Sequence, residues 1–141
     1  MIHMENEIIR VMVFGTFDIL HPGNFYLFEQ AKKLGNFLIV VVGRDETVRK
    51  VKGKMPKHDE NERLLGVSKN PIVDKAVLGN LDDPYKVIEE HHPDIICLGY
   101  DQESYIANGL QDELIKRSLT AKIVKIGPHK EDVYKSSKIT D

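Results

Sequence analysis

A short apolar run, followed at once by a turn and an amphipathic helix, lies near the start of the 141-residue chain. The run Val11 to Phe14 is typical of a buried strand, and residues 15–24 after it read GTFDILHPGN. Apolar residues then recur at helical spacing, which predicts a helix over Gly23 to Leu34. Pro22 suits the first helical position, so His21 is expected at a helix N-terminus, where unpaired backbone N–H groups and the helix dipole favour a phosphate.

The rest of the chain alternates strand and helix signals and shows no internal repeat or linker. Short apolar runs predict strands, and polar stretches with periodic apolar residues predict helices. The expected strands are Ile9 to Phe14, Phe37 to Val42, Lys75 to Leu78, Asp94 to Leu98 and Ala121 to Ile126. The expected helices are Gly23 to Leu34, Glu60 to Lys69, Pro84 to His91 and Glu103 to Ser118. The segment from Gly43 to Lys57 is polar and basic.

Strands separated by helices predict right-handed βαβ units and a parallel sheet. The expected fold is α/β: a Rossmann-like, doubly wound five-stranded parallel sheet in the order 3-2-1-4-5, with residues 1–141 forming a single domain. In this order the chain reverses direction between the first and fourth strands, and ligands bind at such a switch point. The loops expected to meet there are Gly15 to Asn24 and Gly99 to Gln102.

Composition and charge exclude several classes of protein. A net charge of −2 provides no general attraction to nucleic acid or to an anionic membrane. No run approaches the roughly 18 apolar residues that cross a bilayer, and no signal-peptide core is evident, so a cytoplasmic protein is expected. The single cysteine, Cys97, excludes an internal disulfide. No histidine spacing indicates a metal site, so no protein-bound metal is expected.

The sequence Gly15-Thr16-Phe17-Asp18, followed by His21-Pro22-Gly23, resembles the signature of the cytidylyltransferase-like nucleotidylyltransferase superfamily. There, G-T-F-D precedes a His-x-Gly-His tetrad at the start of the first helix. The resemblance implies that a phosphate oxygen of an acceptor attacks the α-phosphorus of a nucleoside triphosphate, and that pyrophosphate leaves. It places Asp18 toward the acceptor or a metal and makes His21 a catalytic donor. The nucleotide-binding residues that it implies here are Gly15, Thr16, Phe17, His21, Gly23 and Asn24.

Asn24 is the departure from this signature, because the superfamily has its second histidine there. An amide donates a hydrogen bond but cannot become cationic. Loss of a charge-assisted bond in the transition state costs about 1.5–3 kcal/mol, or ~10- to 150-fold in rate. Two alternatives follow: an enzyme in which Asn24 serves catalysis more slowly or with compensation elsewhere, and a nucleotide-binding protein with weakened catalysis.

Three further positions match features of the superfamily. An acidic residue after the second strand, here Asp45, would face the acceptor. A lysine of a mobile loop reaches the triphosphate; Lys52, which precedes Gly53, is the first choice for it and Lys54 the second. A Glu-Arg pair on a later helix supplies Arg63, expected to face the nucleotide because a guanidinium suits phosphate.

The last matching motifs lie after the fourth strand and near the C-terminus. Gly99 and Asp101 fit a G-x-D pattern that contacts nucleotide or acceptor, with Tyr100 expected on the acceptor side. Ser136 and Ser137 match a motif in which hydroxyl and N–H groups bind the β- and γ-phosphates.

The neighbours of Asp101, Tyr100 and Gln102, look most like the archaeal FAD synthase branch, which transfers AMP from ATP to FMN. The alternatives are CTP-dependent glycerol-3-phosphate cytidylyltransferase and the sugar-phosphate nucleotidylyltransferases. The resemblance also implies a homodimer, and a Mg²⁺-type ion that arrives with the triphosphate.

Overall fold

A computed structural model describes residues 7–99 and 106–127 of the chain. In chain order its elements are β1 (Arg10–Gly15), α1 (Pro22–Lys33), β2 (Phe37–Val42), α2 (Asp45–Lys52), α3 (Glu60–Ser68), β3 (Lys75–Leu78), α4 (Lys86–His91), β4 (Ile95–Leu98), α5 (Leu110–Lys116) and β5 (Lys122–Lys125). Neighbouring strands pair in parallel in the order β3-β2-β1-β4-β5. The predicted doubly wound sheet is confirmed.

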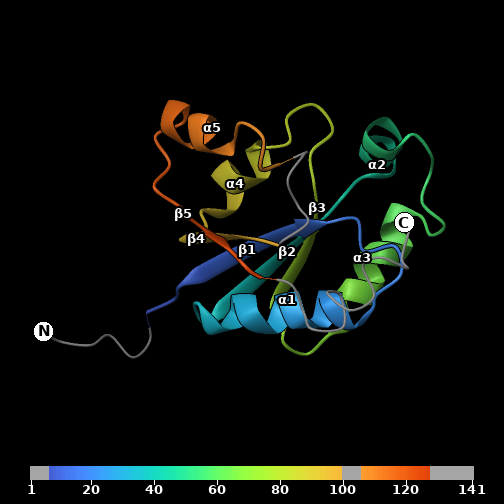
Figure 1. Ribbon diagram of the computed structural model, residues 1–141, viewed down its shortest axis with the longest axis horizontal. Coiled ribbons are helices and arrows are strands. Elements are labelled where there is room, and N and C mark those ends of the chain that lie inside the picture. Colours follow the sequence, from blue (N-terminus) through green and yellow to red (C-terminus); the bar gives the residue numbers. More distant parts are fainter. Residues whose placement is uncertain (1–6, 100–105, 128–141) are drawn as a thin grey trace, which may run out of the picture.

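Helices cover both faces of this sheet (Figure 1). Side chains alternate across β1, so Val11 and Val13 face α1 and α3, whereas Met12 and Phe14 face α4 and α5. Burial on both faces explains why β2 is an uninterrupted apolar run, since a strand covered on both sides has no solvent face. No helix in the described ranges is both long and apolar enough to cross a membrane.

The switch point of the sheet lies where β1 has β2 on one side and β4 on the other. Val11 pairs with Leu38 of β2 and with Ile95 of β4. The loop after β1 therefore emerges beside the end of β4, as expected from the strand order. This arrangement places the signature loop at the edge of the sheet where ligands of open α/β proteins bind.

The segment expected to be a mobile lysine loop contains a helix instead. In α2, Asp45 and Glu46 occupy the first turn and basic residues the last turn, which complements the helix dipole. Val48 is buried and anchors α2 to the rest of the fold. Gly53 ends the helix in the left-handed conformation, with φ +81°. This short helix could not be predicted from the sequence, because the segment is highly charged and a single buried apolar residue gives no helical periodicity.

The last helix begins later than expected. Within the described residues, α5 starts at Leu110 rather than at residue 103. Gly109, directly before it, has φ +84°, which a right-handed helix cannot include. The helix α4 likewise starts at Lys86, two residues after the expected Pro84.

Candidate active site

The signature loop owes its shape to the packing of Phe17. The Phe17 ring is 8% exposed and lies 5.3 Å from the Phe28 ring of α1. It folds over Gly15, where an added Cβ would lie 2.5 Å from Phe17 Cζ, so only glycine fits. Phe17 itself has φ +54°, a strained value for a non-glycine residue. The core therefore holds the backbone of Thr16, which lies between these two residues, in one conformation.

His21 and Asn24 cap the start of α1 through one another's side chains. The Gly23 N–H donates to His21 Nδ1 at 3.1 Å, and the His21 N–H donates to Asn24 Oδ1 at 3.1 Å. Because Nδ1 accepts a hydrogen bond, the proton of the neutral imidazole sits on Nε2. The ring thus presents an N–H donor on the side away from the helix.

Sequence reasoning expected unpaired backbone N–H groups at this helix start, and the structure corrects that expectation. The N–H groups of His21, Gly23 and Asn24 all have partners within the turn, and Pro22 has none to offer. The donors left for a phosphate are side-chain groups: Nε2 of His21 and the Asn24 amide nitrogen, whose neighbouring oxygen is already used. The helix dipole adds to the attraction for an anion.

Arg63 is a buried junction between three segments of the chain. Its side chain is 0% exposed, and its Nη1 donates to the Thr16 carbonyl at 2.8 Å and to the Gly43 carbonyl at 2.7 Å. Nε donates to the His58 carbonyl at 2.9 Å, and Nη2 contacts Asp45 Oδ1 at 2.7 Å. The guanidinium and Asp45 therefore hold together the loops after β1 and β2 and the segment before α3.

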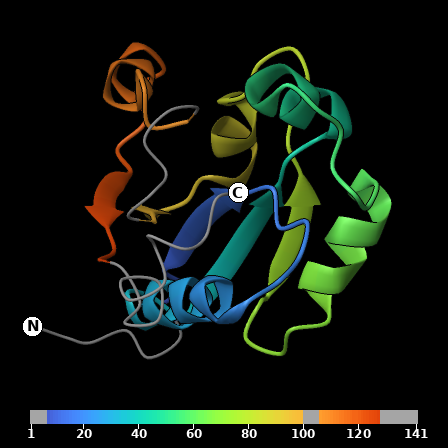
Figure 2. The ribbon, with the colours of Figure 1, turned by 45° about the vertical axis from the view of Figure 1, so that its right-hand side comes forward.

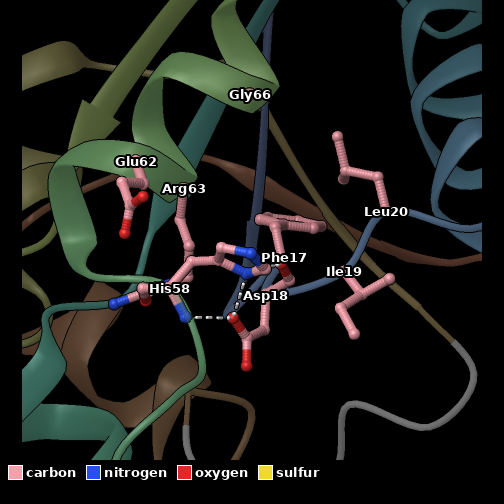
Figure 3. Close-up of a pocket in the computed structure, with 8 residues that line it drawn as sticks. All are labelled: Phe17, Asp18, Ile19, Leu20, His58, Glu62, Arg63 and Gly66. Atoms are coloured by element: carbon pink, nitrogen blue, oxygen red, sulfur yellow. Dashed lines mark hydrogen bonds and ion pairs between the residues drawn. The ribbon is translucent and has the colours of Figure 1, made fainter.

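Asp18 forms a second connection between the signature loop and the segment before α3. Its carboxylate accepts hydrogen bonds from the backbone N–H groups of Lys57 at 2.7 Å and His58 at 2.9 Å. His58 Nδ1 lies 3.1 Å from the same carboxylate (Figure 3). Burial acts to raise the pKa of Asp18, but the hydrogen bonds and the His58 ring outweigh it, so the pKa lies below its ordinary value of 3.8.

A pocket of about 310 Å³ opens between the signature loop and α3 (Figure 3). Its wall combines apolar side chains of the loop with polar side chains from the loop, from α3 and from the segment before α3. The lining residues are Phe17, Asp18, Ile19, Leu20, His58, Glu62, Arg63 and Gly66. The last loop residue in the wall, Leu20, directly precedes His21 in the chain. The pocket wall is therefore continuous along the chain with the capped helix start.

Some of the remaining expected site residues lie in the described part of the chain and others do not. Lys52 is exposed in the last turn of α2, which lies beyond the carboxyl ends of the strands (Figure 2). Gly99 follows β4 at the switch point. Four expected site residues lie outside the described residues: Tyr100, Asp101, Ser136 and Ser137.

Sequence reasoning missed two residues that organise the site. The spacing of His58 to the other histidines indicates no metal site, and its partner Asp18 lies 40 residues away in the chain. Glu60 accepts from Arg44 Nη1 and from the Asp45 N–H, both at 2.9 Å, and so joins α3 to the start of α2. No local pattern marks either contact.

The fold and the site define a class of protein. It has a doubly wound α/β sheet and, at the switch point of that sheet, a helix start capped by histidine that suits phosphate binding. The chain belongs to the cytidylyltransferase-like family, whose model matches residues 12–141. Within the described ranges, no three His, Cys, Asp or Glu side chains are grouped as metal ligands.

Individual proteins similar to this chain include enzymes named FAD synthase and a solved structure. The FAD synthase of Thermoplasma volcanium is 46% identical over 131 residues, covering 93% of this chain and 91% of that protein. The FAD synthase of Archaeoglobus profundus is 47% identical over 130 residues, covering 92% and 81%. A solved structure described as the lipopolysaccharide core biosynthesis protein from Thermoplasma volcanium is 46% identical, with a TM-score of 0.82 over 88% of this chain and 100% of that one.

Proposed function

We propose that this chain is an FAD synthase, an enzyme that transfers AMP from ATP to FMN and releases pyrophosphate. One observation carries the proposal: relatives named FAD synthase are 46% and 47% identical to it over more than nine-tenths of its length. The signature loop at the switch point of the sheet is the feature that suits this reaction.

In the proposed reaction, a phosphate oxygen of FMN bonds to the α-phosphorus of ATP, and the bond from that phosphorus to the pyrophosphate oxygen breaks. Such transfers depend mainly on positioning and on stabilising charge at the phosphoryl oxygens. We assign this stabilisation to Nε2 of His21 and the amide nitrogen of Asn24, the two side-chain donors at the start of α1. The Thr16 backbone, held by Arg63, would border the nucleotide.

The finer parts of the proposal concern metal, assembly and location. A Mg²⁺ ion would be coordinated chiefly by the triphosphate and water, because the described residues supply no ligand cluster. It would offset phosphate charge, while the residues named above position the reacting groups. We also expect a homodimer and a cytoplasmic location, in line with the proposed FAD synthase function.

The test measures pyrophosphate release with Mg²⁺ in four reactions, crossing ATP and CTP with FMN and glycerol 3-phosphate. We expect release only from ATP with FMN, and FAD as the second product. Release only from CTP with glycerol 3-phosphate would replace this function with a cytidylyltransferase activity. Nucleotide binding without release in any reaction would favour the nucleotide-binding protein with weakened catalysis.

Asn24→His measures what the departure from the signature means. If native activity is compensated elsewhere, the variant gains no more than about twofold in kcat. A gain of about tenfold or more would show that the chain turns over slowly because it lacks the second imidazole.

A further inference from the structure

Gly66 lies inside α3 without a reason in the fold that surrounds it. Glycine in a helix interior costs about 1 kcal/mol relative to alanine. At Gly15 and Gly35 an added Cβ would come within 2.5 Å of another atom, which explains those glycines. The nearest atom to an added Cβ at Gly66 would be Leu20 Cδ1 at 4.0 Å, an ordinary van der Waals contact, and both residues line the pocket. A longer side chain at this position would extend into the pocket.

The walls of this pocket suit a flat ring with one apolar and one polar edge. Phe17, Ile19 and Leu20 supply the apolar side, with Gly66 opposite (Figure 3). A volume of about 310 Å³ falls at the lower end of the range for small-molecule sites. The opening thus has the size and composition of a site for part of a ligand.

Most of the polar groups in the wall are already used. Asp18 accepts three hydrogen bonds from the segment before α3, and Arg63 donates to four protein oxygens. Glu62 uses Oε1 to accept from the Asp59 N–H at 3.0 Å. Among the described residues, His58 Nε2 has no such partner, so this atom is available to a ligand. Because His58 Nδ1 donates to Asp18, Nε2 of the neutral ring is an acceptor and suits the N–H group of a heterocycle.

The position of the pocket connects it to the reaction. Its loop wall, residues 17–20, runs directly into His21, and consecutive Cα atoms are about 3.8 Å apart. In FMN, the ribityl chain separates the ring from the phosphate that attacks ATP. A ring in the pocket would therefore bind next to the turn that carries His21.

We propose that the pocket bounded by Phe17, Leu20 and Gly66 binds the isoalloxazine ring of the flavin acceptor. This assignment rests on the proposed FAD synthase function. A second copy of the chain is the other candidate occupant, and the small volume and the adjoining reaction site favour the ring.

The test fills the pocket from α3 and measures flavin binding. Riboflavin, which carries the ring and the ribityl chain without the phosphate, and FMN are titrated by flavin fluorescence against the wild-type chain, Gly66→Val and Gly66→Leu. Ser68→Leu places the same leucine side chain at an exposed site of the same helix and is the matched control. We expect Gly66→Leu to weaken both flavins about tenfold or more, with ATP affinity and the control unchanged.

Each result decides the assignment. Unchanged flavin affinity in a folded Gly66→Leu variant would overturn it, and Gly66→Val decides if the leucine variant does not fold. A change in molecular mass on sedimentation, with flavin affinity kept, would assign the pocket to a contact between copies. If the wild-type protein makes FAD and both Gly66 variants keep its KM for FMN, the pocket assignment is wrong and the proposed function stands. Flavin binding that depends on Gly66, without FAD formation, would instead remove the proposed function.

Discussion

At the scale of single residues, His21 and Asn24 depend on each other. Asn24 accepts from the His21 backbone, while the His21 ring accepts from Gly23. These bonds orient the imidazole and fix its Nε2 proton. Asn24, which replaces the second signature histidine, therefore has a structural role in addition to any hydrogen bond that its amide donates to a phosphate.

His21→Asn separates the capping role of His21 from its proposed catalytic role. Asparagine is among the best helix N-caps, so stability should stay within about 0.5 kcal/mol. Loss of the imidazole donor should lower kcat about 10- to 150-fold. His21→Ala, which loses the cap as well, should also lose about 1 kcal/mol in urea unfolding. Wild-type turnover in His21→Asn would contradict the catalytic role.

Asp18 should make stability depend on pH. Its folded-state pKa lies below 3.8 because Lys57 and His58 hydrogen bonds outweigh the opposing effect of burial. The stabilisation is thus complete above the unfolded-state pKa and is lost as pH falls through the folded-state pKa.

The measurement compares wild type with Asp18→Asn by urea unfolding. The stability difference should be larger at about pH 7 than at about pH 3, where the unfolded state is largely protonated. Asp82→Asn, at an exposed position on another loop, is the control. A difference that does not vary with pH would mean that the carboxylate charge of Asp18 is not what stabilises this contact.

At the scale of elements, the site is built where α2 and α3 meet the ends of β1 and β2. Arg63 joins the loops after both strands, and Glu60 joins α3 to α2. The signature loop is consequently held from two sides, by the core through Phe17 and by α3 through Arg63.

Arg63→Met should destabilise the protein by about 3–5 kcal/mol, because it leaves Asp45 and three carbonyl groups without their donor. Arg49→Met, an exposed arginine paired with Glu46 on α2, should cost at most about 1 kcal/mol. Both are measured by urea unfolding. Equal small losses would show that the buried guanidinium is not needed to hold these loops.

Lys52→Ala tests whether α2 supplies a cation to the triphosphate. We expect the KM for ATP to rise about tenfold, the effect of losing one charge-assisted hydrogen bond. The thermal midpoint should not change, because Lys52 is exposed. Lys50→Ala, also exposed on α2, is the matched control. Equal effects of both substitutions would indicate general attraction by charge and not a contact of Lys52.

At the scale of the whole molecule, two apolar layers enclose a sheet whose switch point carries the site. The layer beneath α1 and α3 supports the signature loop through Phe17 and Phe28. Stability of this layer and geometry of the site are therefore linked.

Cys97 reports on the intactness of that layer. It is 0% exposed in β4, and burial raises the pKa of its thiol to about 11. In the native protein at about pH 8, a thiol reagent should label Cys97 at least a thousandfold more slowly than in the urea-unfolded protein. Labelling requires unfolding, which costs several kcal/mol. Ser68→Cys adds an exposed thiol as the positive control. Fast labelling of Cys97 in the native protein would show that the layer opens readily.

Sequence by itself determined the α/β class, the strand order, the helix start at His21 and the family. These features rest on local patterns: apolar runs, helical periodicity, a proline at the first helical position and a signature within ten residues. It did not reveal α2, whose only buried anchor is Val48.

Only the tertiary structure decided the partners of Arg63, the pairing of Asp18 with His58, and the pocket between the signature loop and α3. The Arg63 contact with Thr16 spans 47 residues of chain, and the Asp18 contact with His58 spans 40. The structure also showed that the N–H groups at the start of α1 are already paired. Such contacts depend on how packed elements bring distant atoms within hydrogen-bond range, and the spacing of residues along the chain carries no record of that distance.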